Sequence, residues 1–241
     1  MRLLSYNIHK GIGGRDRRYR LDRILEVIRH EDPDLLCLQE VARGNPRSYR
    51  HDQPRMLAEL VGLEGQLFQP TVHWKEGGYG NLILSRWPIR AHHHVSLAFG
   101  AKKARGAQIA TVGTPEGPLL LVNWHLGLGE GERDWQARHL LGHRSFLESA
   151  HLPAILAGDA NDWRDRLADD PIGPAGFRQA TQPPWRFRSF PACLAIASLD
   201  KAFYRGDVFI RKARIVHSRG SREASDHLPL MLDFSLKPAQ A

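Results

Sequence analysis

The chain has 241 residues, of which 42% are hydrophobic and 25% are charged. This composition is that of an ordinary globular protein, so disordered and fibrous classes are excluded, and we take residues 1–241 as a single domain. No apolar run approaches the ~20 residues of a membrane-spanning helix, and no secretory signal is recognisable, so we expect a cytoplasmic monomer with no integral membrane segment.

The balance of charge favours a polyanionic partner. Lysine and arginine number 34 against 26 acidic residues, which gives a formal net charge of +8. Seven of the 34 are lysines, which leaves 27 arginines, and the planar guanidinium group matches the geometry of a phosphate. An excess of arginine over lysine can also reflect the composition of a genome, so this second reading stays open at this point.

The first part of the chain alternates strands and helices. An apolar strand is expected at residues 3–8, and a helix at 21–30, where apolar side chains repeat with helical spacing. A second apolar strand at 35–39 follows, and a short helix at 54–61 comes after it.

From residue 66 onward the pattern changes to strands and turns. Strand-like runs separated by glycine and proline occur at 82–84, 89–97, 106–112 and 119–124. The longest helix is expected at 132–150, and a short buried strand at 154–157. Further strands are expected at 197–204, 211–216 and 228–234. The order of these elements indicates a layered α/β fold with mixed sheets and helices outside, although the pattern alone does not separate a sandwich from a barrel.

Polar residues lie at or just beyond the ends of these strands. They are Asn7, Glu40, His125, Asp159, Asn161, Asp200, Asp226 and His227. Any one of them is most simply a cap or a turn residue. So many together are harder to explain in that way, because strand ends on one side of a sheet converge on a common crevice. Carboxylates, amides and imidazoles in one crevice are suited to metal-assisted hydrolysis.

The types of ligand also predict the metal. Carboxylate and amide oxygens without thiolates favour Mg²⁺, or Mn²⁺, over zinc. The run His92-His93-His94 lies in an expected strand, where successive side chains point to opposite faces, so we interpret these histidines as ordinary strand residues. A zinc hydrolase is a distant alternative, because the chain contains no His-Glu-x-x-His motif of the helical zinc sites.

Seven short motifs occur in a particular order along the chain. They are Tyr6-Asn7-Ile8, Leu38-Gln39-Glu40-Val41, Gly80-Asn81, Asn123-Trp124-His125, Gly158-Asp159-Ala160-Asn161, Leu199-Asp200-Lys201 and Ser225-Asp226-His227. In this order they resemble the endonuclease/exonuclease/phosphatase superfamily, which includes pancreatic-type deoxyribonucleases, exonuclease III-type repair enzymes, neutral sphingomyelinases and inositol-polyphosphate 5-phosphatases. The stretches 7–11, 158–164 and 189–191 are similar to small stand-alone bacterial members. The resemblance implies a single catalytic domain with a four-layer α/β (α+β) sandwich, in which two mixed β-sheets pack face to face and helices cover the outer faces.

The resemblance also implies a metal site and a base. Glu40 would be the principal Mg²⁺ ligand, with Asn7 beside it and Asp226 contributing to the same site. Asp159 would orient or deprotonate the attacking water, and Asn161 would hold a phosphate oxygen.

The remaining roles concern the phosphate itself. The resemblance implies that His227, held by Asp200, contacts the phosphate together with His125. It assigns Arg105 and Asn81 to substrate binding; Arg105 aligns roughly with a phosphate-binding arginine of the deoxyribonucleases.

Two departures from the exonuclease III-type pattern argue against an abasic-site repair enzyme. These enzymes usually carry an aspartate at the position of His9 and a tyrosine at the position of His125. We therefore predict a Mg²⁺-dependent phosphodiester hydrolase, with a nuclease acting on DNA or RNA slightly ahead of an enzyme acting on anionic phospholipid or inositol phosphate. A non-catalytic, basic nucleic-acid-binding protein is the third possibility, and the intact set of acidic and histidine residues argues against it.

Arginines gather in the segments that follow or precede the predicted catalytic residues. They are Arg15, Arg17, Arg18, Arg20, Arg43, Arg47, Arg50, Arg55, Arg219 and Arg222. This placement predicts positive charge around the mouth of the site and a polyanionic substrate. Tyr19, Tyr49 and Trp163 are interleaved with these arginines and are candidates for stacking on bases.

Overall fold

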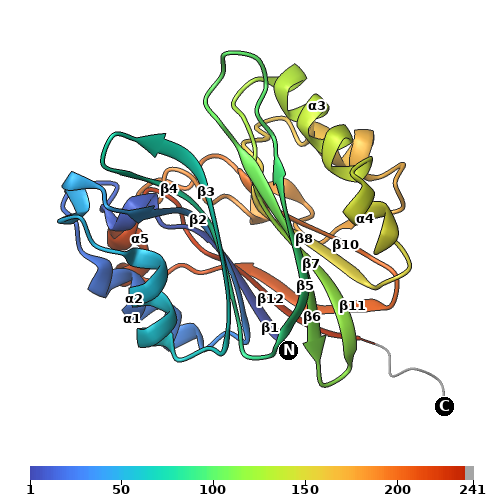
Figure 1. Cartoon of the computed structure of the whole chain (residues 1–241), viewed down its shortest axis with the longest axis horizontal. Coiled ribbons are helices and arrows are strands. Elements are labelled where there is room, and N and C mark those ends of the chain that lie inside the picture. Colours follow the sequence, from blue (N-terminus) through green and yellow to red (C-terminus); the bar gives the residue numbers. More distant parts are fainter. Residues whose placement is uncertain (237–241) are drawn as a thin grey trace.

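Two six-stranded sheets lie face to face in the computed structural model, which describes residues 1–236 (Figure 1). The first sheet contains, in spatial order, β11 (Val208–Ile215), β12 (Leu230–Leu236), β1 (Arg2–Asn7), β2 (Leu35–Arg43), β4 (Gly77–Ser85) and β3 (Gly65–Trp74). The second contains β5 (Ile89–Ser96), β6 (Gly106–Thr114), β7 (Gly117–His125), β8 (Ala154–Asp159), β10 (Asp200–Arg205) and β9 (Arg178–Gln179). The pairs β1–β2 and β7–β8 are parallel and the other pairs are antiparallel, so both sheets are mixed.

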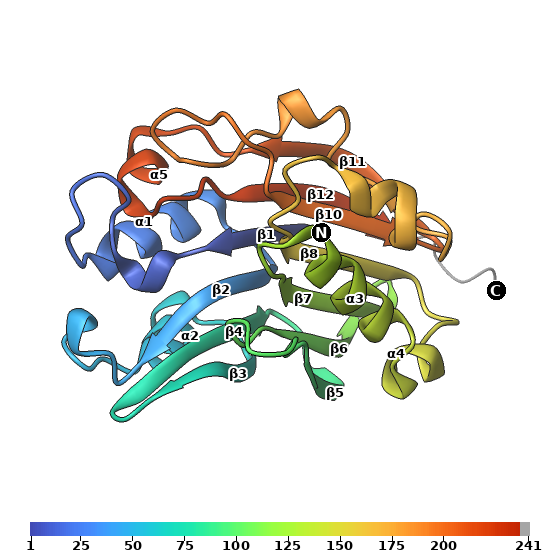
Figure 2. The ribbon, with the colours of Figure 1, turned by 90° about the horizontal axis from the view of Figure 1, so that it is seen from above.

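Helices cover the outer face of each sheet (Figure 2). The first sheet packs against α1 (Leu21–Glu31), α2 (Gln53–Val61) and α5 (Arg219–Ala224), and the second against α3 (Glu130–Leu141) and α4 (Arg144–Glu148). A third apolar cluster, drawn from the inner faces of both sheets, fills the space between them. The predicted four-layer α/β sandwich is therefore confirmed.

The loops contain short helical turns. In the described chain these are η1 (His9–Gly11), η2 (Pro46–Ser48), η3 (Ala168–Ile172) and η4 (Pro184–Arg186). Within residues 1–236, no helix combines the length and the apolar character needed to cross a membrane.

The structure corrects several of the predicted elements, and α5 and β9 lie where none was expected. The long helix expected at 132–150 is two helices, because Gly142 ends α3 and the His143 side chain accepts a hydrogen bond from the Ser145 amide at the start of α4. Glycine is a poor helix former, so a break at this position is inexpensive. Strand β3 was not predicted, since Pro70 and the run of half-buried residues from Pro70 to Val72 hide its alternation; it is an edge strand with a register shift at Pro70.

Buried amide side chains join the two sheets near the ends of their strands. Asn123 of β7 accepts a hydrogen bond from Gln39 of β2 over 2.8 Å and donates to the Leu38 carbonyl over 3.0 Å. Gln108 of β6 accepts from Asn123 and donates across the interface to the Leu67 carbonyl of β3 over 2.7 Å. Because an unpaired buried amide is costly, these bonds favour one alignment of the sheets over others.

Gly158 allows β7 and β8 to lie close together just before the end of β8. Its φ is +151°, and a Cβ there would lie 2.0 Å from the Trp124 carbonyl oxygen, a backbone atom that cannot move away without separating the strands. We expect Gly158→Ala to lower the free energy of unfolding by about 2–4 kcal/mol in urea denaturation. The control is Gly131→Ala, at an open position in α3, which should raise it by about 0.5–1 kcal/mol. Equal effects of the two substitutions would contradict this reading of β8.

Candidate active site

Three ionisable side chains lie in a row at the ends of three adjacent strands of the second sheet. In the strand register His125 of β7 pairs with Asp159 of β8, and Asp159 pairs with Asp200 of β10. Strand β10 runs antiparallel to β8, so Asp200, its first residue, lies where β8 ends. The structure thus brings together three predicted site residues that are separated by 34 to 75 positions in the sequence.

Asp159 lies at the centre of the site and is almost completely buried. Its Oδ2 accepts a hydrogen bond from Asn7 Nδ2 of the opposite sheet over 3.0 Å, and it lies 3.3 Å from His125 Nε2 and 3.7 Å from His227 Nε2. Its Oδ1 accepts from the backbone amide of Asn161 over 3.0 Å. Burial raises the pKa of Asp159; the positive charge of His227 opposes this effect. The result is a carboxylate that binds a proton more readily than an exposed aspartate.

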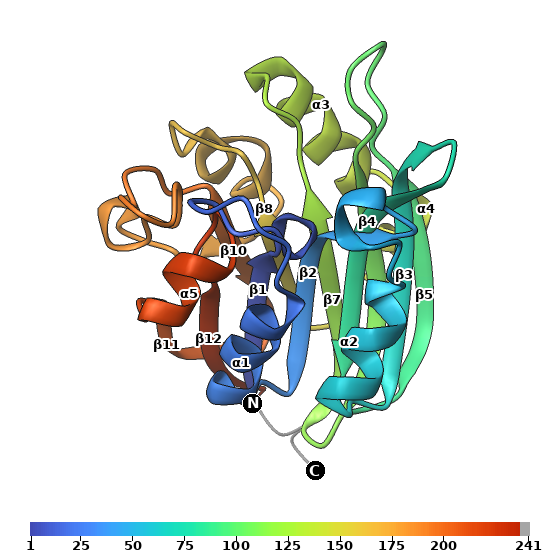
Figure 3. The ribbon, with the colours of Figure 1, turned by 90° about the vertical axis from the view of Figure 1, so that its left-hand side faces the viewer.

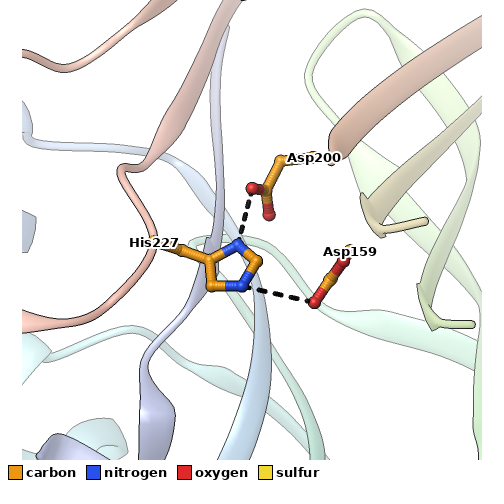
Figure 4. Close-up of side chains that lie close together, drawn as sticks. All are labelled: Asp159, Asp200 and His227. Atoms are coloured by element: carbon orange, nitrogen blue, oxygen red, sulfur yellow. Dashed lines mark hydrogen bonds and ion pairs between the residues drawn. The ribbon is translucent and has the colours of Figure 1, made fainter. Parts of the chain in front are cut away.

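His227 lies between two carboxylates (Figure 4). Its Nδ1 is 2.8 Å from Asp200 Oδ2, and its Nε2 faces Asp159. Burial alone would lower the pKa of His227, but the charges of Asp200 and Asp159 outweigh burial and raise it to about 10. The ring is therefore an imidazolium at neutral pH. The hydroxyl of Ser189, a residue to which the sequence assigned no role, donates to the same oxygen of Asp200.

His125 has the opposite protonation state. Arg105 Nη1 donates a hydrogen bond to His125 Nε2 over 2.6 Å, and burial together with the charge of Arg105 holds the pKa of His125 well below its usual value. The ring is neutral, with Nε2 as the acceptor. The Nε of Arg105 is buried and has no partner within the described residues. A buried donor without a partner is suited to an anionic oxygen brought by a substrate.

Glu40 lies in a bulge of β2, where the pairing with β4 shifts register between Leu38 and Val41. Its φ is +55°, an uncommon conformation for a residue with a side chain, and the bulge directs this carboxylate out of the regular alternation. The ammonium group of Lys10 pairs with Glu40 Oε2 and lies 4.8 Å from the centre of the Tyr79 ring. Burial alone would raise the pKa of Glu40, but the charge of Lys10 lowers it, so Glu40 is ionised.

Lys10 is a residue of the site that sequence reasoning missed. The stretch 7–11 contains it, yet nothing in its spacing showed that its side chain would return to Glu40. Its backbone φ of +63° within η1 makes this return possible.

Three further predicted residues lie around this centre. Asp226 Oδ2 is 3.7 Å from His9 Nδ1, and its side chain is partly exposed. Asn161 has a φ of +50°, and its Nδ2 donates to the Leu126 carbonyl over 3.0 Å. Asn81 is buried between the sheets and donates to the Gly106 carbonyl over 2.8 Å, so its amide nitrogen holds the residue next to Arg105. A contact between Asn81 and substrate remains a prediction.

The residues of the site fit a hard divalent cation. Among residues 1–236, one group of acidic and histidine side chains has its ligand atoms within 4.8 Å of one another: Asp159, Asp200 and His227. The imidazolium of His227 has no free lone pair for a metal, so we interpret this group as an acid–base array. Glu40, Asn7 and Asp226 offer the oxygen donors that Mg²⁺ prefers. Glu40 is half-buried and ionised against a cation already, which shows that positive charge is stabilised there.

The three consecutive histidines lie away from this centre, on the edge strand β5. Their side chains are exposed, and the rings of His92 and His94 are 6.0 Å apart. Successive residues of a strand point to opposite faces, so His93 faces away from this pair. The prediction that they are ordinary strand residues fits this arrangement.

Comparison with known proteins places the chain in a wider context. Residues 4–227 match the model of the endonuclease/exonuclease/phosphatase family. The uncharacterised protein YbhP of Escherichia coli is 28% identical over 249 residues, which span 98% of this chain and 96% of YbhP. The crystal structure of an endonuclease/exonuclease/phosphatase from Beutenbergia cavernae superposes with a TM-score of 0.80, with 24% identity over 98% of this chain and 72% of that one. The human Nocturnin catalytic domain, solved with a bound sulfate, gives a TM-score of 0.74, with 22% identity over 98% and 93% of the two chains.

The pairing of His227 with Asp200 predicts how the ring titrates. In metal-free protein, we expect Asp200→Asn to move the NMR titration midpoint of His227 from about 10 down toward the ordinary value of 6.5. The raised pKa of His227 increases the free energy of unfolding. This contribution is fully present below pH 6.5 and is lost as the pH rises through about 10. Asp200→Asn should therefore destabilise the protein more at pH 6 than at pH 10.5 in urea denaturation. The exposed-turn variant Asp207→Asn is the control, and an unchanged midpoint in Asp200→Asn would refute the pairing.

Proposed function

The chain belongs to the endonuclease/exonuclease/phosphatase family, and from this premise we propose that it hydrolyses phosphodiester bonds with the help of a divalent metal ion. A fold hosts many activities, so the proposal rests on the site. The observation that supports it most is the convergence on one buried carboxylate, Asp159, of an amide from one sheet and two imidazoles of opposite protonation state. Such a set offers a base, Asp159, and a positive charge, the imidazolium of His227, next to the position of one phosphate group.

Asp159 is the proposed general base. A catalytic base works best when its pKa lies near the working pH, and burial moves the pKa of Asp159 in that direction. The hydrogen bonds from Asn7 and from the Asn161 amide hold the carboxylate in one orientation. In this role Asp159 accepts a proton from the attacking water.

Arg105 and His227 are the proposed stabilisers of negative charge. Phosphoryl transfer spreads charge over the oxygens of the phosphate, and preorganised donors lower the barrier by matching that charge. The imidazolium of His227 can also give a proton to the leaving oxygen. Neutral His125 orients Arg105 through the 2.6 Å hydrogen bond and leaves the unpartnered Nε free for a phosphate oxygen.

Glu40, Asn7 and Asp226 are the proposed ligands of Mg²⁺ or Mn²⁺. When bound, the ion would act as a Lewis acid and neutralise charge on the phosphate. Lys10 pairs with Glu40 and adds a second positive charge beside this position.

A nucleic acid is the first candidate substrate. The arginines named above, from Arg15 to Arg55 together with Arg219 and Arg222, are all exposed, as a contact with a polyanion requires. Of the three aromatic residues considered for base stacking, Tyr49 and Trp163 are exposed, whereas Tyr19 is half-buried and its hydroxyl bonds to His51 Nδ1. Tyr19 is therefore a packing residue. Anionic phospholipid is the second candidate, favoured by the exposed aliphatic side chains Leu194 and Ile196 on the loop that carries Phe190, whose ring lies 4.9 Å from that of His227.

Substitution of the proposed base and acid tests the mechanism. We expect Asp159→Asn and His227→Ala each to lower kcat for bis-p-nitrophenyl phosphate by about 10²–10⁴-fold in Mg²⁺. Because Asp200 acts through His227, the double variant Asp200→Ala/His227→Ala should be little slower than His227→Ala alone. Losses that multiply would mean that the two residues act independently, and unchanged rates in the single variants would reject the assignment.

Removal of the central carboxylate ligand tests the metal. We expect Mg²⁺ to raise the melting temperature of the wild-type protein, since a ligand that binds only the folded state stabilises it. Glu40→Gln should abolish both this increase and hydrolysis. Glu59→Gln, on the exposed face of α2, is the control and should retain both properties. Wild-type turnover and a normal Mg²⁺ shift in Glu40→Gln would exclude Glu40 as a ligand.

A further inference from the structure

Four large apolar side chains are exposed on neighbouring loops. Trp163 is 57% exposed, Trp185 67%, Leu194 70% and Ile196 60%. Trp163, Trp185 and Ile196 line one depression of about 310 Å³, and Leu194 lies two residues before Ile196 on the same loop. We call these four residues the apolar patch. Side chains of this size and number in water are unfavourable, and such a patch is typical of a contact surface.

The apolar patch lies beside the candidate active site. The rings of Trp163 and Phe190 are 6.1 Å apart, and the rings of Phe190 and His227 are 4.9 Å apart, so a continuous line of side chains joins the patch to the site. In Figure 3 the loops between β8 and β10 lie at the upper left, at the end of the molecule opposite the N-terminus. A surface that covered the patch would also lie close to His227.

Arginines adjoin the patch in the sequence, and Arg188 lines the same depression as Trp163, Trp185 and Ile196. Arg164 and Arg166 follow Trp163, and Arg186 and Arg188 follow Trp185; all four are exposed. Asp165, which lies among them, is paired with the ammonium group of the buried Lys201, and Arg164 Nη1 lies 3.7 Å from Glu130 Oε2. The partner of the patch should therefore combine an apolar region with negative charge.

These features distinguish between two kinds of polyanion. Tryptophan rings can stack on nucleic-acid bases, but the side chains of Leu194 and Ile196 can neither stack nor form hydrogen bonds. Their contact with a partner is favourable only because it removes apolar surface from water. A bilayer accepts aliphatic side chains below its headgroups, tryptophan at the interface and arginine at anionic headgroups. We propose that the apolar patch, with Arg188 beside it, docks the protein on the surface of a membrane that contains anionic phospholipids.

Docking of this kind goes beyond phosphodiester hydrolysis, and it does not require turnover. It would bring the headgroup phosphodiesters of the membrane to the side of the site that carries Phe190 and His227. Hydrolysis of those phosphodiesters is a further step, and that step rests on the proposed function.

Vesicle binding tests the proposal. Vesicles of phosphatidylcholine with about 30% phosphatidylglycerol would be sedimented with the full chain in EDTA, so that no turnover occurs. We expect the wild-type protein to sediment with these vesicles and not with pure phosphatidylcholine. Ile196→Glu and Leu194→Glu should each lower the partition coefficient by about tenfold, because each places a charge where an apolar side chain enters the bilayer.

Leu147→Glu is the matched control, since Leu147 is 57% exposed on α4, outside the patch. It should bind as the wild type does, and equal melting temperatures would show that all variants are folded. Absence of vesicle binding, or wild-type binding by Ile196→Glu and Leu194→Glu, would overturn the proposal. A third result would also overturn it: the wild-type protein binds a single-stranded oligothymidylate but no vesicles, and the two variants lose the oligothymidylate binding. That result would assign the patch to nucleic acid. Failure to hydrolyse bis-p-nitrophenyl phosphate would count against the proposed function and leave docking intact.

Discussion

A carboxylate buried where two sheets meet is the constraint on which the rest of the site depends. Asp159 belongs to the second sheet, but Asn7, which bonds to it, ends a strand of the first. The site therefore exists only while the two sheets keep one alignment. The buried amides of Gln39 and Asn123 join the sheets close to this edge, and they offer a physical reason why that alignment is maintained.

The same burial makes the charges of the site costly, and most of them are paired. Charges removed from water are costly unless they are paired. Asp159 and Asp200 are compensated by the imidazolium of His227, and Glu40 by Lys10. Arg105 is compensated less completely, since it faces a neutral imidazole and keeps one buried donor without a partner. A bound phosphate would complete this balance, which is why the arrangement suits an anionic substrate better than a neutral one.

Sequence reasoning located the strands with continuous apolar runs, such as β1, β2 and β8, because burial on both faces leaves a strong pattern. It failed for β3, an edge strand in which Pro70 interrupts the alternation. Polar residues at strand ends could be recognised as candidates, but their pairing could not. The contact of Lys10 with Glu40 depends on a left-handed turn and a bulge, and the contact of Ser189 with Asp200 depends on a loop that returns to β10. Neither leaves a periodic signal in the chain.

Cleavage of phosphodiester bonds at this site with a metal ion can be measured in a single panel of hydrolysis rates. Plasmid DNA, RNA, bis-p-nitrophenyl phosphate, phosphoinositides and cardiolipin vesicles would each be incubated with the full chain in Mg²⁺, in Mn²⁺ and in EDTA. Our account predicts cleavage of at least one phosphodiester in Mg²⁺ or Mn²⁺ and none in EDTA. Cleavage that persists undiminished in EDTA, or no cleavage of any substrate with either metal, would contradict it.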